Sequence, residues 1–194
     1  MGISENEFNS AVTACGYSRP GREVYRHFAN ETTSFSRGEL AMFLAQLIHE
    51  SGGFQYKEEI AYAGNNHHNA YVDNVGLPGK TYHGRGYIQL TWGANYKACS
   101  EGLGMGDYLL RHPEVVARDT EMAVKVSVWY WKARVRPQIR GQEDCFGATT
   151  NAINGAIECS GGFNQQAYNR YQKYLKVADA MNIRNKAREN GCYN

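Results

Sequence analysis

Apolar residues recur every three or four positions in several stretches, which predicts a mainly helical chain. The clearest stretch follows Ser36, and Glu39 three residues later completes the sequence pattern of a capping box. Gly52 and Gly53 are expected to end this helix. Its predicted apolar face consists of Leu40, Phe43, Leu44, Leu47 and Ile48.

Three further helices are expected from the same periodicity and from capping residues at Ser4, Asp119 and Asn164. Between residues 51 and 82 the periodicity gives way to Gly, Asn, His and Tyr, which indicates a loop. The apolar residues of the three helices are Phe8, Ala11 and Val12; then Met122, Val126 and Trp129; and finally Tyr168, Tyr171, Leu175, Ala178 and Met181.

Residues 87–91, Tyr-Ile-Gln-Leu-Thr, alternate between apolar and polar side chains and predict a short strand. Gln89 and Thr91 would share one face, and Ile88 and Leu90 the other. If the apolar face packs inward, an amide and a hydroxyl point into a cleft. A buried turn with structural Gln and Thr side chains explains the same pattern equally well.

Aromatic residues flank this segment, namely Tyr82, Trp92 and Tyr96. Their rings suit the apolar face of a sugar, because an aromatic ring offers a flat hydrophobic surface. Amides and hydroxyls beside aromatic rings are typical of a carbohydrate-binding surface. The segment therefore favours a sugar site over packing alone.

Glu50 lies in the last turn of the predicted helix, where unpaired carbonyls carry partial negative charge. This field and the apolar neighbours favour the protonated carboxyl, the state that a general acid needs near neutral pH. Glu58 and Glu59 follow in the loop. The combination points to acid/base hydrolysis of a sugar bond. Taken alone, Glu50 is better explained as an ordinary surface residue at a frayed helix end, and only the neighbouring motifs favour a catalytic role.

Composition is that of an ordinary globular protein, and the 194 residues are expected to form a single domain, 1–194. The net charge of +2, without a dense run of Lys or Arg, gives no reason to expect a nucleic-acid partner. No apolar segment is long enough to span a membrane, so no membrane association is expected.

No metal site is expected, because the cysteines lack the Cys-x-x-Cys spacing of a zinc site. The histidine pair at 67–68 lies in a Gly- and Asn-rich stretch and is interpreted as a solvated loop. The chain has five cysteines, namely Cys15, Cys99, Cys145, Cys159 and Cys192. Because five is an odd number, at least one thiol is free or paired with another chain.

The N-terminus, Met-Gly-Ile-Ser-Glu-Asn, is polar and unlike a signal peptide. An intracellular protein and a mature chain without its leader both remain open on this ground. The number of cysteines exceeds what a cytosolic enzyme needs, so a secreted protein is expected.

Three segments, taken together, resemble family 19 of the glycoside hydrolases, the lysozyme-like chitinases. They are His49-Glu50-Ser-Gly-Gly with Glu59, the segment 82–92, and the segment 150–159, which occur in the family's order. The resemblance implies a mainly helical, lysozyme-like catalytic domain with a small β element beside a substrate cleft. It also implies endo-acting hydrolysis of β-1,4-N-acetylglucosamine linkages with inversion and without a cofactor.

The resemblance implies roles for individual residues. Glu50 matches the catalytic acid and Glu59 the catalytic base, at the spacing of the short, loop-poor members. Thr91 matches the hydroxyl residue that helps the base to hold the attacking water. Glu58 is the weaker candidate for the base, because adjacent residues usually point in different directions.

Further positions match residues that contact the sugar chain or flank the cleft, among them the amides of Gln89, Asn95 and Asn154. Glu158 and Arg170 match a charged pair beside the cleft. The family also implies a disulfide between the cysteine of the third segment and one near the C-terminus, here Cys159 and Cys192. The substrate-binding candidates are His49, Tyr82, Gln89, Trp92, Asn95, Tyr96, Asn154, Glu158 and Arg170.

Three positions depart from the family's pattern, and at one of them Ser51 replaces a common Thr. His83 stands where the family usually has an aromatic residue, and its titration is expected to influence the pH profile. Ala94 stands where the family has Tyr or Phe, so one sugar subsite is expected to be weaker.

The expected partner is chitin or a chito-oligosaccharide, bound by a monomer. A peptidoglycan-cleaving endolysin is the first alternative, because phage lysins share this fold and parts of these motifs. A non-catalytic chitin-binding protein is the second. A non-catalytic binding protein need not retain Glu50, Glu59 and Thr91 together. Assays on chitin and on peptidoglycan separate a chitinase from an endolysin.

Overall fold

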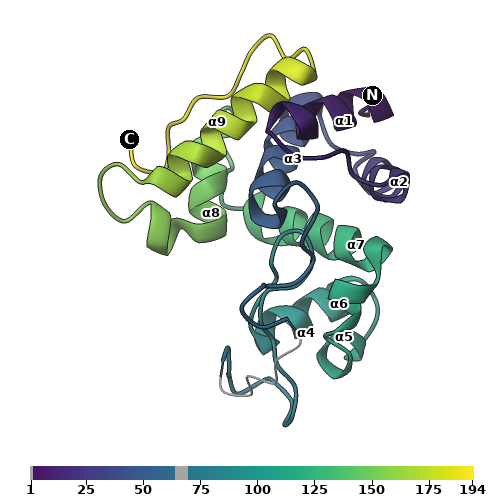
Figure 1. Ribbon diagram of the computed structural model, residues 1–194. Helices are drawn as coiled ribbons and strands as arrows, with labels where there is room; N and C mark the ends of the chain where they lie inside the picture. The colour runs from purple at the N-terminus through teal and green to yellow at the C-terminus, as the bar shows by residue number, and fades with distance from the viewer. Residues whose placement is uncertain (1, 64–69) are drawn as a thin grey trace.

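In the computed structural model, which describes residues 2–63 and 70–194, the chain is mainly helical, as its periodicity predicts (Figure 1). The histidine pair at 67–68 lies outside the described residues. The helices are α1 (Glu5–Ala14), α2 (Arg22–Glu31), α3 (Arg37–Ser51), α4 (Gly93–Gly102), α5 (Tyr108–Arg111), α6 (Val115–Arg118), α7 (Thr120–Tyr130), the π-helical turn η1 (Trp131–Val135), α8 (Phe146–Glu158) and α9 (Gln165–Ala180).

Helix α3 is the central helix of the larger part of the molecule. Every residue from Leu40 to Ile48 is buried, including Gln46. The prediction of a single apolar face was therefore too narrow, because neighbouring helices cover α3 on all sides. Gly52 ends the helix in the left-handed conformation, with φ of 57°, which a residue without Cβ adopts at little cost.

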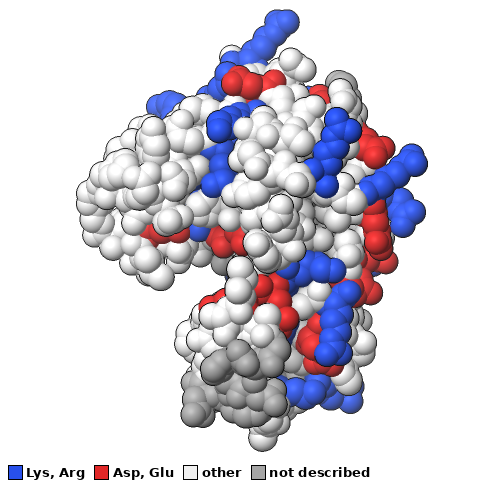
Figure 2. Space-filling model, viewed as in Figure 1, with Lys and Arg blue, Asp and Glu red and all other residues white. Residues whose placement is uncertain are grey.

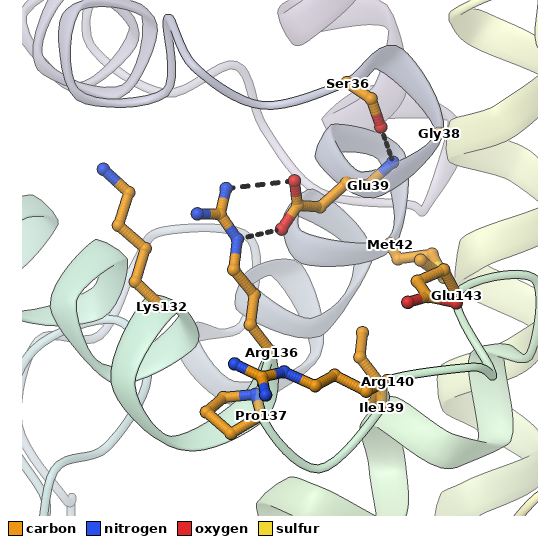
Figure 3. A pocket seen from close by; sticks show the side chains of 10 residues that line it. All are labelled: Ser36, Gly38, Glu39, Met42, Lys132, Arg136, Pro137, Ile139, Arg140 and Glu143. Carbon is orange, nitrogen blue, oxygen red and sulfur yellow. Dashed lines mark hydrogen bonds and ion pairs between the residues drawn. The ribbon is translucent and has the colours of Figure 1, made fainter.

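The start of α3 forms only half of the predicted capping box. The Ser36 hydroxyl accepts a hydrogen bond from the Glu39 N–H at 3.2 Å. The Glu39 carboxylate turns away to accept from Arg136 Nη2 at 3.1 Å (Figure 3). It also accepts from Trp131 Nε1 at 2.8 Å. These bonds fasten η1 to α3 at the edge of a cavity of about 470 Å³, which none of the candidate site residues lines.

The hydrophobic core consists of two clusters of buried residues, and α7 contributes side chains to both. Helix α7 gives Ala123, Val124 and Val128 to the larger cluster and Val126 to the smaller one. Figure 1 shows α4, α5 and α6 on one side of α7, and α1, α3, α8 and α9 on the other. The smaller cluster consists of Tyr82, Leu90, Tyr96, Cys99, Leu109, Leu110, Val116 and Val126.

The strand predicted at 87–91 is wrong. Arg85 and Leu90 form an isolated antiparallel bridge, and the residues between them make a tight turn. Gln89 lies in this turn with φ of 59°. Ile88 and Leu90 are buried, so a turn with two inward side chains reproduces the alternation that a strand would give. Within the described residues, the small β element consists of isolated bridges.

Helix α9 begins at Asn164, as predicted, with the Asn164 side chain accepting from two backbone N–H groups. Its buried face agrees with the predicted one at Ala178 and Met181 but differs nearer the start of the helix. Tyr168 is exposed, whereas Arg170 and Tyr174 are buried. The interior position of Arg170 explains the error, because apolar periodicity assigns a charged residue to the surface.

The disulfide between Cys159 and Cys192 is present, which confirms the pairing that the family resemblance implies. The C-terminal segment also lies directly on α8: Phe146 N–H donates to the Arg188 carbonyl at 2.6 Å. A Cβ at Gly147 would lie 1.8 Å from the Glu189 carbonyl oxygen, so only glycine allows this approach. The segment is thus fastened at both ends of α8.

A buried ionic cluster joins α3, α8 and α9. Arg170, 2% exposed, donates from Nε and Nη2 to the two carboxylate oxygens of Glu158, both at 2.8 Å. Its Nη1 donates to Gln46 Oε1 at 2.8 Å, and its Nη2 lies 2.6 Å from Glu50 Oε1. Gln46 Nε2 in turn donates to two threonine hydroxyls of α8. One guanidinium therefore fixes three helices.

Replacing Arg170 should expose how much stability this cluster provides. Arg170→Met is expected to lower the free energy of unfolding by about 3–5 kcal/mol near pH 7, because Glu158 would stay buried without a counter-charge. Urea unfolding near pH 7 measures this loss.

Arg188→Met is the matched control, because Arg188 pairs with Asp144 while both side chains are largely exposed. An exposed pair contributes little, so this variant should unfold like the parent protein. Equal losses of stability in the two variants would contradict the assignment.

Candidate active site

A cavity of about 180 Å³ lies between the two hydrophobic clusters and collects several residues selected from the sequence. Figure 2 shows a deep notch at this level of the molecule, with acidic side chains on both walls. Glu50 and Asn154 come from α3 and α8, and Gln89 and Thr91 from the turn after residue 85. The cavity lining comprises Glu50, Ile88, Gln89, Thr91, Asn95, Tyr130, Ile153 and Asn154.

Glu50 lies in the last turn of α3, as the sequence predicts, with 17% of its side chain exposed. Its surroundings include a cation that the sequence argument did not consider. The Arg170 guanidinium lies 2.6 Å from Glu50 Oε1 and fixes the carboxylate at the cavity wall.

His49 precedes Glu50 but is not among the residues that line the cavity. Its Nδ1 lies 3.3 Å from Lys173 Nζ of α9. Burial, together with the nearby charges of Arg170 and Lys173, lowers the pKa of His49 to about 2. The imidazole therefore stays neutral at ordinary pH, and its place argues for packing rather than for sugar contact.

Glu59 is held on the loop side by donors to both of its carboxylate oxygens. Gly84 N–H donates to Oε2 at 3.2 Å, and the Tyr71 hydroxyl donates to Oε1 at 3.1 Å. The neighbouring Glu58 is occupied elsewhere, with its Oε1 2.8 Å from Nε2 of the buried His83. This difference agrees with the expectation that the two adjacent carboxylates point in different directions.

Tyr71 is a residue of the site that the sequence analysis did not select. Besides its bond to Glu59, its ring meets Trp92 edge-on, with centroids 5.3 Å apart. Burial and the negative charge of Glu59 raise the pKa of Tyr71 to about 12, so its hydroxyl keeps the proton that it donates. The chain has 14 tyrosines, and nothing in the sequence pattern separates this one from the others.

Two of the three aromatic candidates belong to the core, which corrects the sequence interpretation. Tyr82 is 2% exposed and donates to the Leu110 carbonyl at 2.7 Å; Tyr96 is fully buried and donates to the His83 carbonyl at 2.8 Å. Their rings fill the smaller hydrophobic cluster and are closed to a ligand. Trp92, at 45% exposed, is the candidate whose ring reaches the surface.

Glu158 and Arg170 also need correction as direct substrate contacts, because both are buried. They form the support behind the cavity wall. Glu158 Oε1 accepts a hydrogen bond from Asn154 Nδ2 at 2.9 Å, and Arg170 fixes Glu50. Their role is to orient the side chains that line the cavity.

The remaining amide candidates line the cavity, and two of them donate hydrogen bonds to backbone carbonyls of the wall. Gln89 Nε2 donates to the Gly86 carbonyl at 3.1 Å, and Asn95 Nδ2 donates to the Thr91 carbonyl at 2.9 Å. A Cβ at Gly84 would lie 2.6 Å from Gln89 Oε1, so glycine leaves room for this amide. The sequence did not indicate Tyr130 and Ile153, which complete the lining.

Over residues 2–63 and 70–194, no cluster of three or more His, Cys, Asp or Glu side chains is suited to hold a metal ion. The helices of this part of the chain are all too short or too polar to cross a bilayer. The chemistry that the described site offers is that of carboxyl, hydroxyl and amide groups.

Comparison with known proteins gives one consistent result. The family model described as chitinase class I matches residues 8–143. An endochitinase of Arabidopsis thaliana is 36% identical over 185 residues, which cover 91% of this chain and 63% of the relative. The chain thus spans less than two thirds of that relative's length.

Solved structures agree in fold. Chitinase C from Streptomyces griseus is 30% identical with a TM-score of 0.76, covering 95% of this chain and 78% of that one. The class IV chitinase from Zea mays is 28% identical with a TM-score of 0.75, covering 94% of each chain. These matches confirm the resemblance seen in the three sequence segments, and the chain belongs to the chitinase class I family, family 19 of the glycoside hydrolases.

Proposed function

We propose that the protein is an endo-acting chitinase that hydrolyses β-1,4-N-acetylglucosamine linkages with inversion of configuration. The observation that carries the proposal is the pair Glu50 and Glu59, two carboxyls on separate elements, each oriented by fixed donors. Membership of the family supports the same chemistry. The substrate is chitin or a soluble chito-oligosaccharide, and no cofactor takes part.

Glu50 is the general acid of this mechanism. Its carboxyl gives a proton to the glycosidic oxygen as the bond from that oxygen to the anomeric carbon breaks. The Glu50 carboxylate that remains is stabilised by Arg170, whose guanidinium nitrogen lies 2.6 Å away. The attraction between Arg170 and the carboxylate disfavours protonated Glu50 before the reaction, but it stabilises the carboxylate that remains once Glu50 has given up its proton.

Glu59 is the general base. It removes a proton from a water molecule whose oxygen attacks the anomeric carbon from the face opposite the leaving group. An inverting enzyme needs roughly 6.5–9.5 Å between the two carboxyl groups to admit this water. The hydroxyl of Thr91 helps to orient the water, and the hydrogen bonds from Tyr71 and Gly84 keep the Glu59 carboxylate in one orientation.

The sugar chain is held by the amides of Gln89, Asn95 and Asn154, with the exposed ring of Trp92 beside them. Acetamide and hydroxyl groups of N-acetylglucosamine both donate and accept, which matches amide side chains. The Cys159–Cys192 disulfide favours an oxidising compartment, so the enzyme is proposed to act outside the cytosol.

Glu50→Gln tests the proposed acid. The amide is nearly isosteric but has no acidic proton, so turnover of a soluble chitin oligomer should fall by about 10²–10⁴-fold while oligomer binding persists. Glu101→Gln, a change at an exposed glutamate of α4, is the control and should leave turnover unchanged. Turnover close to that of the parent protein in Glu50→Gln would refute the assignment.

Tyr71→Phe tests how the base is oriented. The change keeps the ring against Trp92 but removes the hydrogen bond to Glu59, so kcat should fall by about tenfold with KM nearly unchanged. In a Glu59→Ala background it should cause no further loss, because the bond is already absent. Tyr56→Phe, at an exposed tyrosine, is the matched control. Additive losses would show that Tyr71 acts independently of Glu59.

A further inference from the structure

A second surface, outside the cavity, carries exposed aromatic rings at the connection between α8 and α9. Phe163 is 65% exposed, and its ring contacts those of Tyr168 and Tyr193 at centroid distances of 5.6 and 5.5 Å. The Cys159–Cys192 disulfide brings Tyr193 to this connection. Phe163, Tyr168 and Tyr193 are called the aromatic turn below.

The two chain segments that carry the aromatic turn contain no charged side chain, and Glu189 is a neighbouring charge that acts on Tyr193. Residues 159–169 read Cys-Ser-Gly-Gly-Phe-Asn-Gln-Gln-Ala-Tyr-Asn, and residues 190–194 read Asn-Gly-Cys-Tyr-Asn, both without Asp, Glu, Lys or Arg. Figure 2 shows the corresponding left side of the molecule as white, whereas charged side chains are spread over much of the rest of this view. Phosphate-bearing partners such as nucleic acids or anionic lipids need basic residues, which this surface lacks.

The side chains beside the rings are amides, with Gln165 and Gln166 both exposed. Rings offer a flat apolar surface, and amides both donate and accept hydrogen bonds. A neutral polysaccharide presents the matching groups, because its sugar rings have apolar faces and its edges carry hydroxyl and acetamide groups. Exposed apolar groups gathered in one place commonly mark an interaction site.

The aromatic turn is built on the same helices as the cavity wall. Helix α8 carries Ile153 and Asn154, which line the cavity, and α9 carries Arg170, which contacts Glu50. The turn connects these two helices and is tied to the C-terminal segment by the disulfide. A polymer bound there would therefore be held at a fixed position relative to Glu50.

We propose that the aromatic turn is a second carbohydrate-binding surface, which holds the protein on insoluble chitin while a chain is cleaved in the cavity. The choice of chitin among neutral polysaccharides rests on the proposed function. The surface adds affinity for the solid polymer and takes no part in the hydrolysis of short soluble chains.

The test compares binding and turnover of a Phe163→Ala/Tyr168→Ala variant with those of the parent protein. Binding isotherms on insoluble chitin use both proteins with Glu50→Gln added, so that hydrolysis does not consume the solid. The apparent Kd should rise by about tenfold, as for the loss of one or two aromatic contacts. With Glu50 intact, sugar release from insoluble chitin should fall, whereas turnover of a soluble oligomer should not change.

Tyr108→Ala is the matched control, because Tyr108 is an exposed aromatic residue on α5, away from α8 and α9. It should bind insoluble chitin like the parent protein. Equal chitin binding by the double variant and the parent would overturn the proposal. So would loss of soluble-oligomer turnover at an unchanged melting temperature, which would make the turn part of the cavity.

Two further measurements separate other partners. Binding of the parent protein to phosphatidylcholine vesicles, or a dimer in size-exclusion chromatography, would overturn the proposal if Phe163→Ala/Tyr168→Ala abolished it. Failure of the proposed function is a distinct result: the parent protein would then leave soluble chitin oligomers intact, whatever the chitin isotherms of the Glu50→Gln proteins show.

Discussion

The buried guanidinium of Arg170 is the constraint on which the rest of the structure depends. It bonds both oxygens of Glu158, the amide of Gln46 and the carboxylate of Glu50, and so connects α9 to α8 and α3. A buried cation is tolerated only when its donors are satisfied, and here opposite charges and an amide surround it. The same contacts that hold three helices together also fix Glu50 at the end of α3. Stability and the proposed acid chemistry therefore share one residue.

The other wall is organised by backbone geometry together with the buried Arg85, whose Nε lies 3.6 Å from Glu58 Oε1. The Arg85–Leu90 bridge forces a tight turn, in which Gln89 adopts a positive φ and Gly84 leaves room for its amide. Gly84 also donates its N–H to Glu59, so a single turn positions a cavity amide and the proposed base. The smaller hydrophobic cluster beneath this turn rests on α7, which packs on the larger cluster as well. The two walls thus form one cavity although they arise from separate packing units.

Sequence reasoning identified what local signals encode. The caps at Ser4, Asp119 and Asn164 begin helices as predicted, because a capping side chain acts within three residues. The sequence-based predictions failed where packing between distant segments determines which residues are buried. The buried face of α9 includes Arg170, which the apolar periodicity had assigned to the surface. The alternation of apolar and polar residues at 87–91 belongs to a turn and not to the predicted strand. Aromatic residues near the motif were taken for sugar contacts, although burial of Tyr82 and Tyr96 depends on distant segments. Helices α2, α4, α5, α6 and α8 were not predicted from periodicity, and Tyr71 carries no local signal.

The central claim is that Glu50 and Glu59 act on opposite faces of the same sugar, with water between Glu59 and the anomeric carbon. The most direct measurement is the configuration of the first product from a β-linked chitin oligomer, followed by ¹H NMR before mutarotation. The account predicts that the newly formed reducing end appears as the α-anomer, because water attacks opposite the leaving group. An initial β-anomer would mean retention, and would contradict the role of Glu59 as a base that activates water for direct displacement.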